Sequence, residues 1–544
     1  MNDTSTRVAL VSLYAPEDGD ALPLGAGCVA AALIRSARVR REDISLVNAC
    51  VEAGDDLLFR MIVESKPRVV GFSLYCWNSS VSIRLAGRLK DEFPDILVVA
   101  GGPDAERFYA ERFVDRGAGH AALFDAIFLG EAEVSFPKWF AEAAGSHPGD
   151  RGNAAKFIRG QPCDAAALPS PWLEGLLEPV RGGSVAWELT RGCPYRCAYC
   201  YEGRGSYRLR HFPRERLEKE LDLFVESGVK EVFVLDPTFN VQGGRTLSFL
   251  KLFSERGAGI SWNFEIRAEL LDRGQAEAFA AMPCSLQIGL QSVRTEVLKT
   301  IGRDMDKKEF AFKTRLLNQA GAFFGFDLIY GLPGDSLPGF RESLDFAISL
   351  YPNHLDIFPL AVLPGTPLHE RSREYALDFD EEPPYLLRGH PSFPEEDMRA
   401  AARLARACDI FYTKGRAVPW FLPVLKPARM SPSAFLEGFN APEARVPPPH
   451  KELEALQCAY IERIYKTRGM AGLLPAALDL VRYHGAWTRA FAEGETTRLD
   501  LSYPLHKVEG PEILDLAGFH RRNALRTCRI EIGASDRGPV ARNI

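Results

Sequence analysis

The sequence predicts an α/β protein with three domains: a doubly wound, Rossmann-like domain, a partial (β/α)6 barrel of the TIM type, and a C-terminal, mostly helical domain. Its 544 residues are too many for one hydrophobic core. Short apolar runs alternate with helical stretches in two separate blocks, and this alternation stops near residue 385. We therefore expect domains over residues 1–145, 184–385 and 386–544, with a linker rich in Gly, Pro, Ala and Asp over residues 146–183.

The first block contains five apolar runs without polar alternation, separated by helical segments such as Val81 to Phe93. The runs are Val8 to Leu13, Ile44 to Val47, Val69 to Ser73, Ile96 to Ala100 and Ala126 to Leu129. Such strands predict a parallel sheet that is covered on both faces and binds its ligand at the carboxyl ends of its strands. No G-x-G-x-x-G follows the first run, so a dinucleotide site is not predicted.

The second block contains six further apolar runs, each followed by a helical stretch until the last. They begin at Val185, Val232, Trp262, Leu286, Phe323 and His354. Six such units predict a partial barrel with its site at the carboxyl ends of the strands. Beyond residue 385, helical spacing over 395–411, 451–465 and 471–483 predicts the third domain.

Composition excludes several function classes. Hydrophobic residues make up 46% and charged residues 25% of the chain, as in ordinary folded proteins. The net charge is −6 and no long run of lysine and arginine occurs, so we expect no nucleic-acid partner. The apolar segment Val8 to Tyr14 is too short to span a bilayer and predicts a buried strand. We expect a cytoplasmic protein without a membrane anchor.

Three of the eleven cysteines lie close together, and the other eight are scattered singly. Cys193, Cys197 and Cys200 form a C-x-x-x-C-x-x-C pattern directly after the first barrel strand. Three thiolates on one loop can hold three irons of a 4Fe–4S cluster and leave the fourth iron for another ligand. A zinc site is the main alternative, but no second C-x-x-C and no nearby histidine supplies a fourth ligand. Three structural cysteines are the remaining alternative.

This pattern, with Tyr199 just before the last cysteine, resembles the signature of the radical S-adenosylmethionine (SAM) superfamily, and the resemblance extends over residues 184–370. In that family the open iron binds the amino and carboxylate groups of SAM. The reduced cluster then cleaves the sulfonium to give a 5′-deoxyadenosyl radical. The resemblance also implies an external electron donor such as flavodoxin or ferredoxin.

Several strand-end motifs resemble family features in the same order along the chain. They imply SAM contacts from Tyr199, Asp236, Glu265, Arg267, Gln291, Ser292 and Leu363. Each has a simpler alternative: Glu265 and Arg267 could form an ordinary ion pair, and Gln291 and Ser292 could satisfy backbone groups. The polar block Tyr201 to Gly205 could contact the cofactor or be a plain flexible loop.

An α/β domain before such a barrel resembles the cobalamin-binding class of the superfamily. The resemblance implies cobalamin contacts from Leu24, Ser73, Trp77, Asn78, Gly101, Gly102, Pro103, Gly130 and Glu131. The chain departs from the classical pattern because it lacks D-x-H-x-x-G, and residues 1–150 contain only His120 and His147. No histidine is therefore expected below the corrin, and Trp77 or Asn78 could lie against that face. The alternative is a domain that keeps the fold without a corrinoid.

Together these resemblances imply a cobalamin-dependent radical SAM enzyme that methylates an unactivated carbon of a small-molecule or peptide substrate. One SAM would methylate cob(I)alamin, and a second would yield the radical that abstracts a substrate hydrogen. Rearrangement, cyclisation or aminocarboxypropyl transfer remain open, as does a non-catalytic iron–sulfur or corrinoid carrier. The C-terminal region resembles an uncharacterised domain appended in one subgroup, and no motif in it identifies a substrate.

Overall fold

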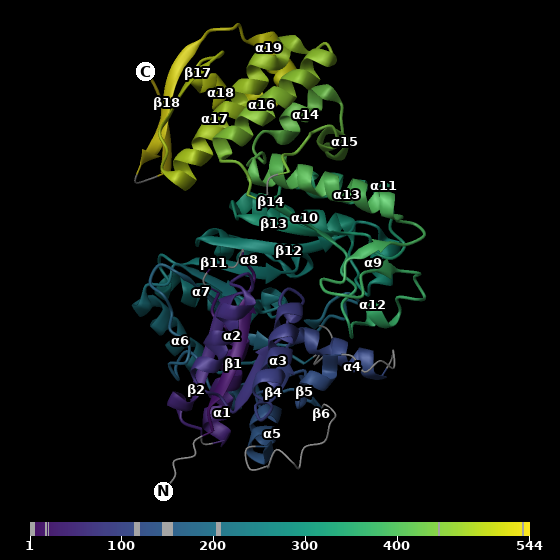
Figure 1. Cartoon of the computed structure of the whole chain (residues 1–544). Helices are drawn as coiled ribbons and strands as arrows, with labels where there is room; N and C mark the ends of the chain where they lie inside the picture. Colours follow the sequence, from purple (N-terminus) through teal and green to yellow (C-terminus); the bar gives the residue numbers. More distant parts are fainter. Residues whose placement is uncertain are drawn as a thin grey trace. The chain divides into compact units, whose positions relative to one another are not determined.

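The structure is a computed structural model that describes residues 6–16, 19, 21–37, 39–113, 120–143, 156–202, 208–443, 446–535 and 538–544 (Figure 1). The chain forms two compact units, which we describe separately. Unit 1 comprises Met1–Leu286, Lys299–Asp304 and Ala361–Arg388. Unit 2 comprises Gln287–Leu298, Met305–Leu360 and Gly389–Ile544. Among the described helices, none combines the length and the apolar composition that a membrane-spanning helix needs.

Unit 1 begins with a six-stranded parallel sheet of order β2-β1-β3-β4-β5-β6. The strands are β1 (Val8–Tyr14), β2 (Ile44–Cys50), β3 (Val69–Ser73), β4 (Leu97–Gly101), β5 (Ala126–Leu129) and β6 (Lys156–Arg159). The helices are α1 (Leu24–Ala37), α2 (Asp55–Glu64), α3 (Ser79–Glu92), α4 (Glu106–Phe113) and α5 (Ser135–Ala143).

Successive residues of β1 pack into different cores, which shows that both faces of this sheet are covered. Ala9 and Val11 join a buried apolar cluster with residues of α2 and α3, whereas Val8 and Leu10 join one with residues of α1 and α5. The predicted doubly wound domain is confirmed. Strand β6 was not expected, because its short sequence Lys-Phe-Ile-Arg lies in the stretch assigned to the linker.

The second six-stranded sheet has the order β14-β13-β12-β11-β10-β7, and its paired strands run parallel. Its strands are β7 (Ser184–Trp187), β10 (Glu231–Val234), β11 (Ser261–Ile266), β12 (Cys284–Gln291), β13 (Phe324–Tyr330) and β14 (His354–Pro359). The helices are α6 (Arg214–Ser227), α7 (Gly243–Arg256), α8 (Arg273–Ala280), α9 (Thr295–Thr300), α10 (Lys307–Ala320), α11 (Leu337–Ser349) and α12 (Pro367–Glu370). The six predicted strand–helix units are therefore present.

A short antiparallel ribbon interrupts the first strand–helix unit of the barrel. Strand β8 (Thr190–Arg191) follows β7 closely, and its partner β9 (Arg210–His211) precedes α6. The three clustered cysteines lie between the two strands of the ribbon. The ribbon therefore closes the base of the cysteine loop.

The C-terminal region of unit 2 is mostly helical, as the sequence predicts. Its helices are α13 (Glu395–Cys408), continued by a π-helical turn (Asp409–Lys414), α14 (Phe421–Ala428), α15 (Pro432–Glu437), α16 (His450–Thr467), α17 (Leu474–Glu493), α18 (Leu505–Val508) and α19 (Leu516–Arg522). Strands β17 (Thr497–Leu501), β18 (Cys528–Ser535) and β19 (Gly538–Asn543) form an antiparallel sheet.

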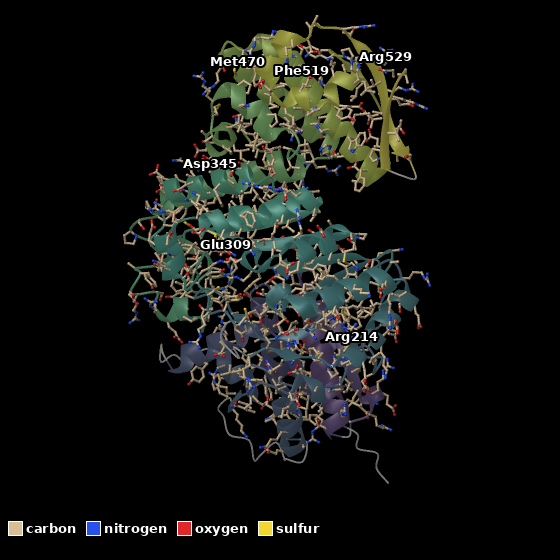
Figure 2. All side chains as sticks on the ribbon, turned by 180° about the vertical axis from the view of Figure 1, so that it is seen from behind. Arg214, Glu309, Asp345, Met470, Phe519 and Arg529 are labelled. Carbon is tan, nitrogen blue, oxygen red and sulfur yellow. The ribbon has the colours of Figure 1, made fainter. Side chains whose placement is uncertain are left out.

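Within unit 2 the C-terminal helices are tied to barrel helix α11. Asp345 on α11 is labelled in Figure 2. It accepts hydrogen bonds from the Ser433 backbone N–H at 2.6 Å and from the Ser433 hydroxyl at 3.0 Å. Because Ser433 lies in the first turn of α15, the carboxylate also satisfies a helix N–H that has no partner within its own helix.

Candidate cofactor sites

The cysteine loop starts directly after β8. Cys193 is 8% exposed, whereas Cys197 and Cys200 are partly exposed. The Cys200 N–H donates to the Cys197 carbonyl at 3.1 Å, which folds the end of the loop into a turn. Burial raises the pKa of the Cys193 thiol. All three sulfurs thus come from one turn-containing loop, and two of them remain accessible to a ligand.

Two distant segments of unit 1 hold this loop through Ala198. The Ala198 N–H donates to the Ile301 carbonyl at 2.8 Å, and the Ala198 carbonyl accepts from the Leu368 N–H at 2.9 Å. Tyr199 also hydrogen-bonds with the buried Arg303. The loop is therefore fixed between its second and third cysteines as well as at its base.

The spacing of the three thiols differs from that of a single-metal site. Among the described His, Cys, Asp and Glu side chains, Glu131, Glu133 and Cys163 form the one set whose ligand atoms all lie within 4.8 Å of one another. One zinc ion with Zn–S bonds of about 2.3 Å keeps its sulfur ligands within about 4.6 Å of each other. Cys193, Cys197 and Cys200 do not form such a set, so their sulfurs do not all lie as close together as the ligands of one zinc ion.

Asp236, expected to contact SAM, is buried against the backbone that leads into the cysteine loop. One of its carboxylate oxygens accepts from the N–H groups of Leu189 at 2.8 Å and Thr190 at 2.9 Å. Burial raises the pKa of Asp236 to about 6. Its contacts give it a role in shaping the turn between β7 and β8.

Arg267, also expected to contact SAM, reaches the cysteine loop. The Arg267 guanidinium lies 3.8 Å from the centre of the Tyr195 ring and contacts Glu269 at 3.2 Å. Its backbone N–H donates to the Asn240 side chain at 2.9 Å. Glu265 is exposed at the end of β11. The structure therefore places Arg267 beside the cysteines.

Gln291 and Ser292 lie at the end of β12, in unit 2. Gln291 is 7% exposed and has a positive φ of 65°, and its buried Oε1 has no hydrogen-bond partner among the described residues. Ser292 is fully buried and its hydroxyl accepts from the Arg294 N–H at 3.2 Å. Gln291 is thus the residue of the pair with free hydrogen-bonding capacity. Leu363, in unit 1, lies in a turn where its carbonyl accepts from the Thr366 hydroxyl at 2.7 Å.

A cavity of about 600 Å³ opens at the carboxyl ends of β3, β4 and β5 in unit 1. Six residues expected to contact cobalamin line it: Ser73, Gly101, Gly102, Pro103, Gly130 and Glu131. Its wall continues to Glu188, Arg191, Gly192, Tyr201, Glu202 and Arg210, which flank the cysteines on both sides. Residues 203–205 of the expected contact block Tyr201 to Gly205 lie outside the described residues. The cavity volume lies within the range of small-molecule binding sites.

Gly102 shows how closely the backbone is packed at the cavity rim. Its φ is +101°, and a Cβ atom built on it would lie 2.5 Å from the Leu74 carbonyl oxygen. Both the conformation and the space therefore require glycine. This absence of side chains lets a flat ligand approach the strand ends, which supports a corrinoid as the cofactor.

Three residues expected to contact cobalamin do not line the cavity: Leu24, Trp77 and Asn78. Leu24 begins α1. Trp77 is 46% exposed, and its ring stacks on Tyr75 with centroids 4.4 Å apart. Asn78 is fully buried and its amide donates to the Leu13 carbonyl at 2.9 Å. Tyr75, which was not predicted, lines the cavity instead.

Of the two histidines in residues 1–150, the structure describes only His120. His120 is exposed at the start of a short 3-10 helix and is not among the residues that line the cavity. His147 lies outside the described residues. The described cavity wall contains no histidine.

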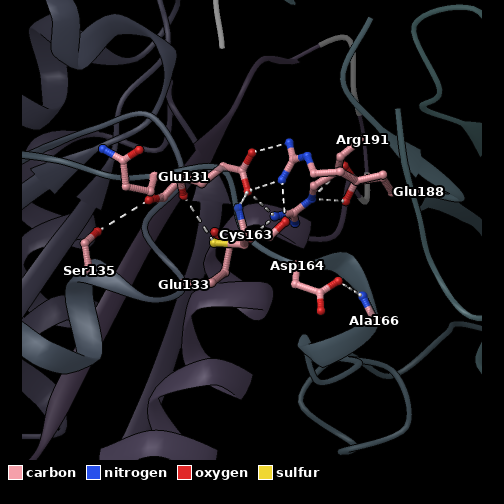
Figure 3. A network of polar contacts seen from close by, with 10 residues as sticks. Glu131, Glu133, Ser135, Cys163, Asp164, Ala166, Glu188 and Arg191 are labelled. Atoms are coloured by element: carbon pink, nitrogen blue, oxygen red, sulfur yellow. Dashed lines mark hydrogen bonds and ion pairs between the residues drawn. The ribbon is translucent and has the colours of Figure 1, made fainter. Parts of the chain in front are cut away.

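Sequence reasoning missed a network of charged residues in the cavity wall (Figure 3). It includes Glu131 and Glu133 after β5, Glu188 after β7, and the two arginines of the ribbon, Arg191 and Arg210. Burial raises the pKa of Glu188 to about 7, although Arg191 acts in the opposite direction. Arg191 pairs with Glu131 and Glu133, and Arg210 pairs with Glu131, so both carboxylates belong to an ion-pair network. In the sequence, the only sign of this charged network was the position of Glu131 next to Gly130.

A second missed contact joins the cavity rim to the segment after the barrel, within unit 1. The Tyr385 hydroxyl donates to Asp104 at 2.6 Å, and Tyr385 is 1% exposed. Arg107, also buried, pairs with Glu382 at 2.9 Å. Asp104 directly follows the cavity residue Pro103. These pairs are separated by more than 270 residues, so no local pattern could reveal them.

Comparison with known families agrees with this geometry. The model of the radical SAM superfamily matches residues 187–347, which contain the cysteine loop, and the model of the B12 binding domain matches residues 14–138, which contain most of the cavity wall. The chain contains a radical SAM domain and a B12-binding domain. The predicted family and fold class are confirmed, whereas the domain boundaries and individual contact residues stay predictions.

Two curated methyltransferases are similar to this chain. The 2-(S-pantetheinyl)-carbapenam-3-carboxylate methyltransferase of Streptantibioticus cattleyicolor is 27% identical over 370 residues, which cover 61% of this chain and 52% of the relative. The cobalamin-dependent radical SAM methyltransferase TokK of Streptomyces tokunonensis is 26% identical over 423 residues, which cover 69% of this chain and 58% of the relative. The chain thus spans somewhat more than half the length of these relatives.

Solved structures share the fold. The cobalamin-dependent SAM radical enzyme OxsB, with aqua-cobalamin bound, matches with a TM-score of 0.55 at 14% identity. The match covers 90% of this chain and 74% of the OxsB chain. The radical SAM methyltransferase TsrM from Kitasatospora setae, with tryptophan and a SAM analog bound, matches with a TM-score of 0.50 at 16% identity. The match covers 68% of this chain and 76% of the TsrM chain. The OxsB match includes most of the C-terminal region, because it covers nine tenths of this chain.

Proposed function

We propose that this protein is a cobalamin-dependent radical SAM methyltransferase that acts on an unactivated carbon. One observation carries the proposal: a single cavity is lined both by the strand-end loops of the B12-binding domain and by residues on either side of the cysteine loop. Two cofactors bound there would lie next to each other. Transfer of a methyl group after hydrogen abstraction needs such proximity.

The residues divide into groups by the cofactor that they suit. Cys193, Cys197 and Cys200 would hold the 4Fe–4S cluster, and Arg267, in the same unit, offers a guanidinium group for SAM. The glycine-rich rim at Gly101, Gly102 and Gly130 would support the corrinoid. When bound, the cluster with SAM supplies an organic radical, and the corrinoid supplies a methyl group. The chain itself binds these groups, orients them and excludes water.

The substrate and the other partners belong to the same proposal. The carbapenam-carboxylate methyltransferase and tryptophan-bound TsrM act on small molecules, which supports a small-molecule or peptide substrate here. Reductive cleavage of SAM needs an electron, for which a flavodoxin or ferredoxin is the proposed source. A cytoplasmic location suits the reduced thiols that the cluster requires.

Anaerobic reconstitution tests the proposal. The purified chain is supplied with iron, sulfide and hydroxocobalamin, and iron, zinc and corrinoid are counted. SAM and a reductant are then added, and 5′-deoxyadenosine is measured. We expect about four irons and one corrinoid per chain, together with 5′-deoxyadenosine well above background.

Cysteine variants provide the matched control. Cys193→Ala, Cys197→Ala and Cys200→Ala should each abolish the brown cluster absorbance and reduce 5′-deoxyadenosine to background. Cys528→Ala, at the start of β18 in the C-terminal region, should retain both. Zinc in place of iron, or undiminished cleavage of SAM by any of the three loop variants, would contradict the proposal. An iron- and corrinoid-loaded protein that forms no 5′-deoxyadenosine would be a carrier.

A further inference from the structure

The ribbon that closes the cysteine loop carries two arginines side by side. Arg191 on β8 and Arg210 on β9 are register partners, one just before Cys193 and the other after Cys200. Both guanidinium groups point to the same loop of the B12-binding domain, the one that follows β5. Both strands at the base of the cysteine loop therefore form ion pairs with the loop that follows β5.

Arg191 makes the more buried set of contacts. It is 9% exposed and contacts Glu133 at 2.6 Å, Glu131 at 3.4 Å and Glu188 at 2.9 Å. Glu133 is itself 7% exposed. Figure 3 shows Glu131 and Arg191 approaching each other from different segments of the chain.

Arg210 also binds the carboxylate of Glu131. It contacts both carboxylate oxygens of Glu131, one of them at 2.8 Å, and donates to the Cys163 carbonyl at 2.7 Å. The Cys163 N–H donates to Glu131 at 2.8 Å. Planar arginine groups bind carboxylates with defined geometry, so this arrangement fixes the orientation of the loop as well as its charge.

The same side chains form part of the cavity wall. Glu131, Glu133, Arg191 and Arg210 all line the proposed corrinoid cavity, and Gly192 separates Arg191 from the first cysteine. A buried charge that loses its partner costs several kcal/mol, so these ion pairs tend to form or break together. The β5 loop and the base of the cysteine loop are therefore joined directly by these ion pairs.

We propose that Arg191 and Arg210 are positioning residues that couple the corrinoid cavity to the cysteine loop. This inference rests on the proposed function, because it requires both cofactors. Ordering of the cysteine loop by its cluster would fix the ribbon, and the fixed ribbon would hold Glu131 and Glu133 in the cavity wall. By thermodynamic linkage, hydroxocobalamin should then bind more tightly to the cluster-loaded protein than to the cluster-free protein.

A binding experiment tests the coupling without any measurement of turnover. The dissociation constant of hydroxocobalamin is measured by anaerobic equilibrium dialysis on the full chain, once with its reconstituted cluster and once after removal of the cluster by chelation. For the wild type we expect roughly tenfold tighter binding in the presence of the cluster, within the range of ordinary allosteric coupling. For Arg191→Met and Arg210→Met we expect the ratio to fall close to one.

Two further variants separate coupling from simple loss of folding. Glu133→Gln removes the carboxylate charge and keeps the side-chain shape, so it should reduce the ratio while the protein stays folded. Arg216→Met is the matched control. Arg216 is also a largely buried arginine of unit 1, where it pairs with Glu220 at 2.9 Å and donates to the Leu168 carbonyl, but it does not line the cavity. Its variant should lose thermal stability and keep the wild-type ratio.

The outcomes distinguish this inference from the proposed function. A wild-type protein that binds both cofactors with a ratio near one would overturn the coupling and leave the function intact. Arginine variants that keep the wild-type ratio would show that the cofactors influence each other directly, which also overturns the coupling. A chain that binds neither cluster nor hydroxocobalamin would overturn both.

Discussion

Two regions of this molecule bury charged groups in different ways. In unit 1, Arg191 and its carboxylate partners line a cavity, so one side of the network can meet a ligand. In the C-terminal region, Arg489 on α17 is 1% exposed and contacts Glu454 at 2.6 Å and His450 at 3.2 Å, both on α16. Helices α16 and α17 enclose these groups.

This difference separates charges that maintain a fold from charges that can also influence a ligand. An enclosed ion pair affects only the free energy of unfolding. A pair in a cavity wall affects both unfolding and binding. Substitutions in the two regions should therefore differ in their effect on hydroxocobalamin affinity even when they destabilise the protein equally.

The largest expected effect belongs to the enclosed network. Arg489→Met leaves the Glu454 carboxylate buried without its cation, and should lower the free energy of unfolding by about 3–5 kcal/mol. Urea denaturation measures this change. Hydroxocobalamin affinity should stay within about twofold of wild type. Arg529→Met is the control in the same region, since it breaks an exposed pair with Asp500 and should cost less than about 1 kcal/mol. A change in affinity in Arg489→Met would remove the distinction between the two regions.

Gly102→Ala should have the next largest effect. The new Cβ would collide with the Leu74 backbone in a conformation that alanine avoids, at a cost of about 3 kcal/mol in stability. Hydroxocobalamin should bind at least tenfold more weakly, because the cavity rim must shift. Gly494→Ala provides the control, since that glycine also has a positive φ, +68°, but its Cβ would meet no atom within 4 Å. It should cost about 1 kcal/mol and leave affinity unchanged. Equal affinity losses in the two variants would contradict the assignment of the rim.

The smallest of these effects depends on pH. Burial, together with the cations Arg416 and Arg489, lowers the pKa of His450 from 6.5 to about 4. The folded state therefore favours neutral histidine, so its contribution to stability is complete above pH 6.5 and is lost as the pH falls toward 4. Between pH 7.5 and 5 the loss should be about 2 kcal/mol.

Chemical denaturation at the two pH values measures the effect of His450. In His450→Gln the side chain cannot gain a proton, yet it can still accept a hydrogen bond from Arg489 and donate to the Gly415 carbonyl. This variant should lose about 2 kcal/mol less than the wild type over the same interval. An unchanged pH dependence would mean that His450 is protonated as easily in the folded state as in the unfolded state.

Much of the fold and the cysteine site could be predicted because their signals are local. Strands without polar alternation identified both parallel sheets, and the spacing of Cys193, Cys197 and Cys200 identified the candidate cluster loop. Strand β6 was not predicted, because its four residues have charged ends and show too little hydrophobic pattern to be distinguished from a linker.

The residues that surround the cofactor sites were harder to predict. Trp77 and Asn78 were expected near the corrin from their position after the third strand, but Tyr75 lines the described cavity and they do not. The pair of Glu131 with Arg210 joins residues 79 positions apart, and each is an ordinary charged residue in its own segment. Such contacts depend on tertiary structure, and one sequence does not indicate which distant partner a surface-type residue will meet.

Residues 361–388 belong to unit 1 although the chain on either side of them belongs to unit 2. A fragment that stops at residue 360 would lose both the Leu368 backbone bond to Ala198 and the Tyr385 phenol that binds Asp104. Exchange of the C-terminal region between homologous chains, in a laboratory chimera or by natural recombination, should therefore be tolerated best when the junction follows Arg388.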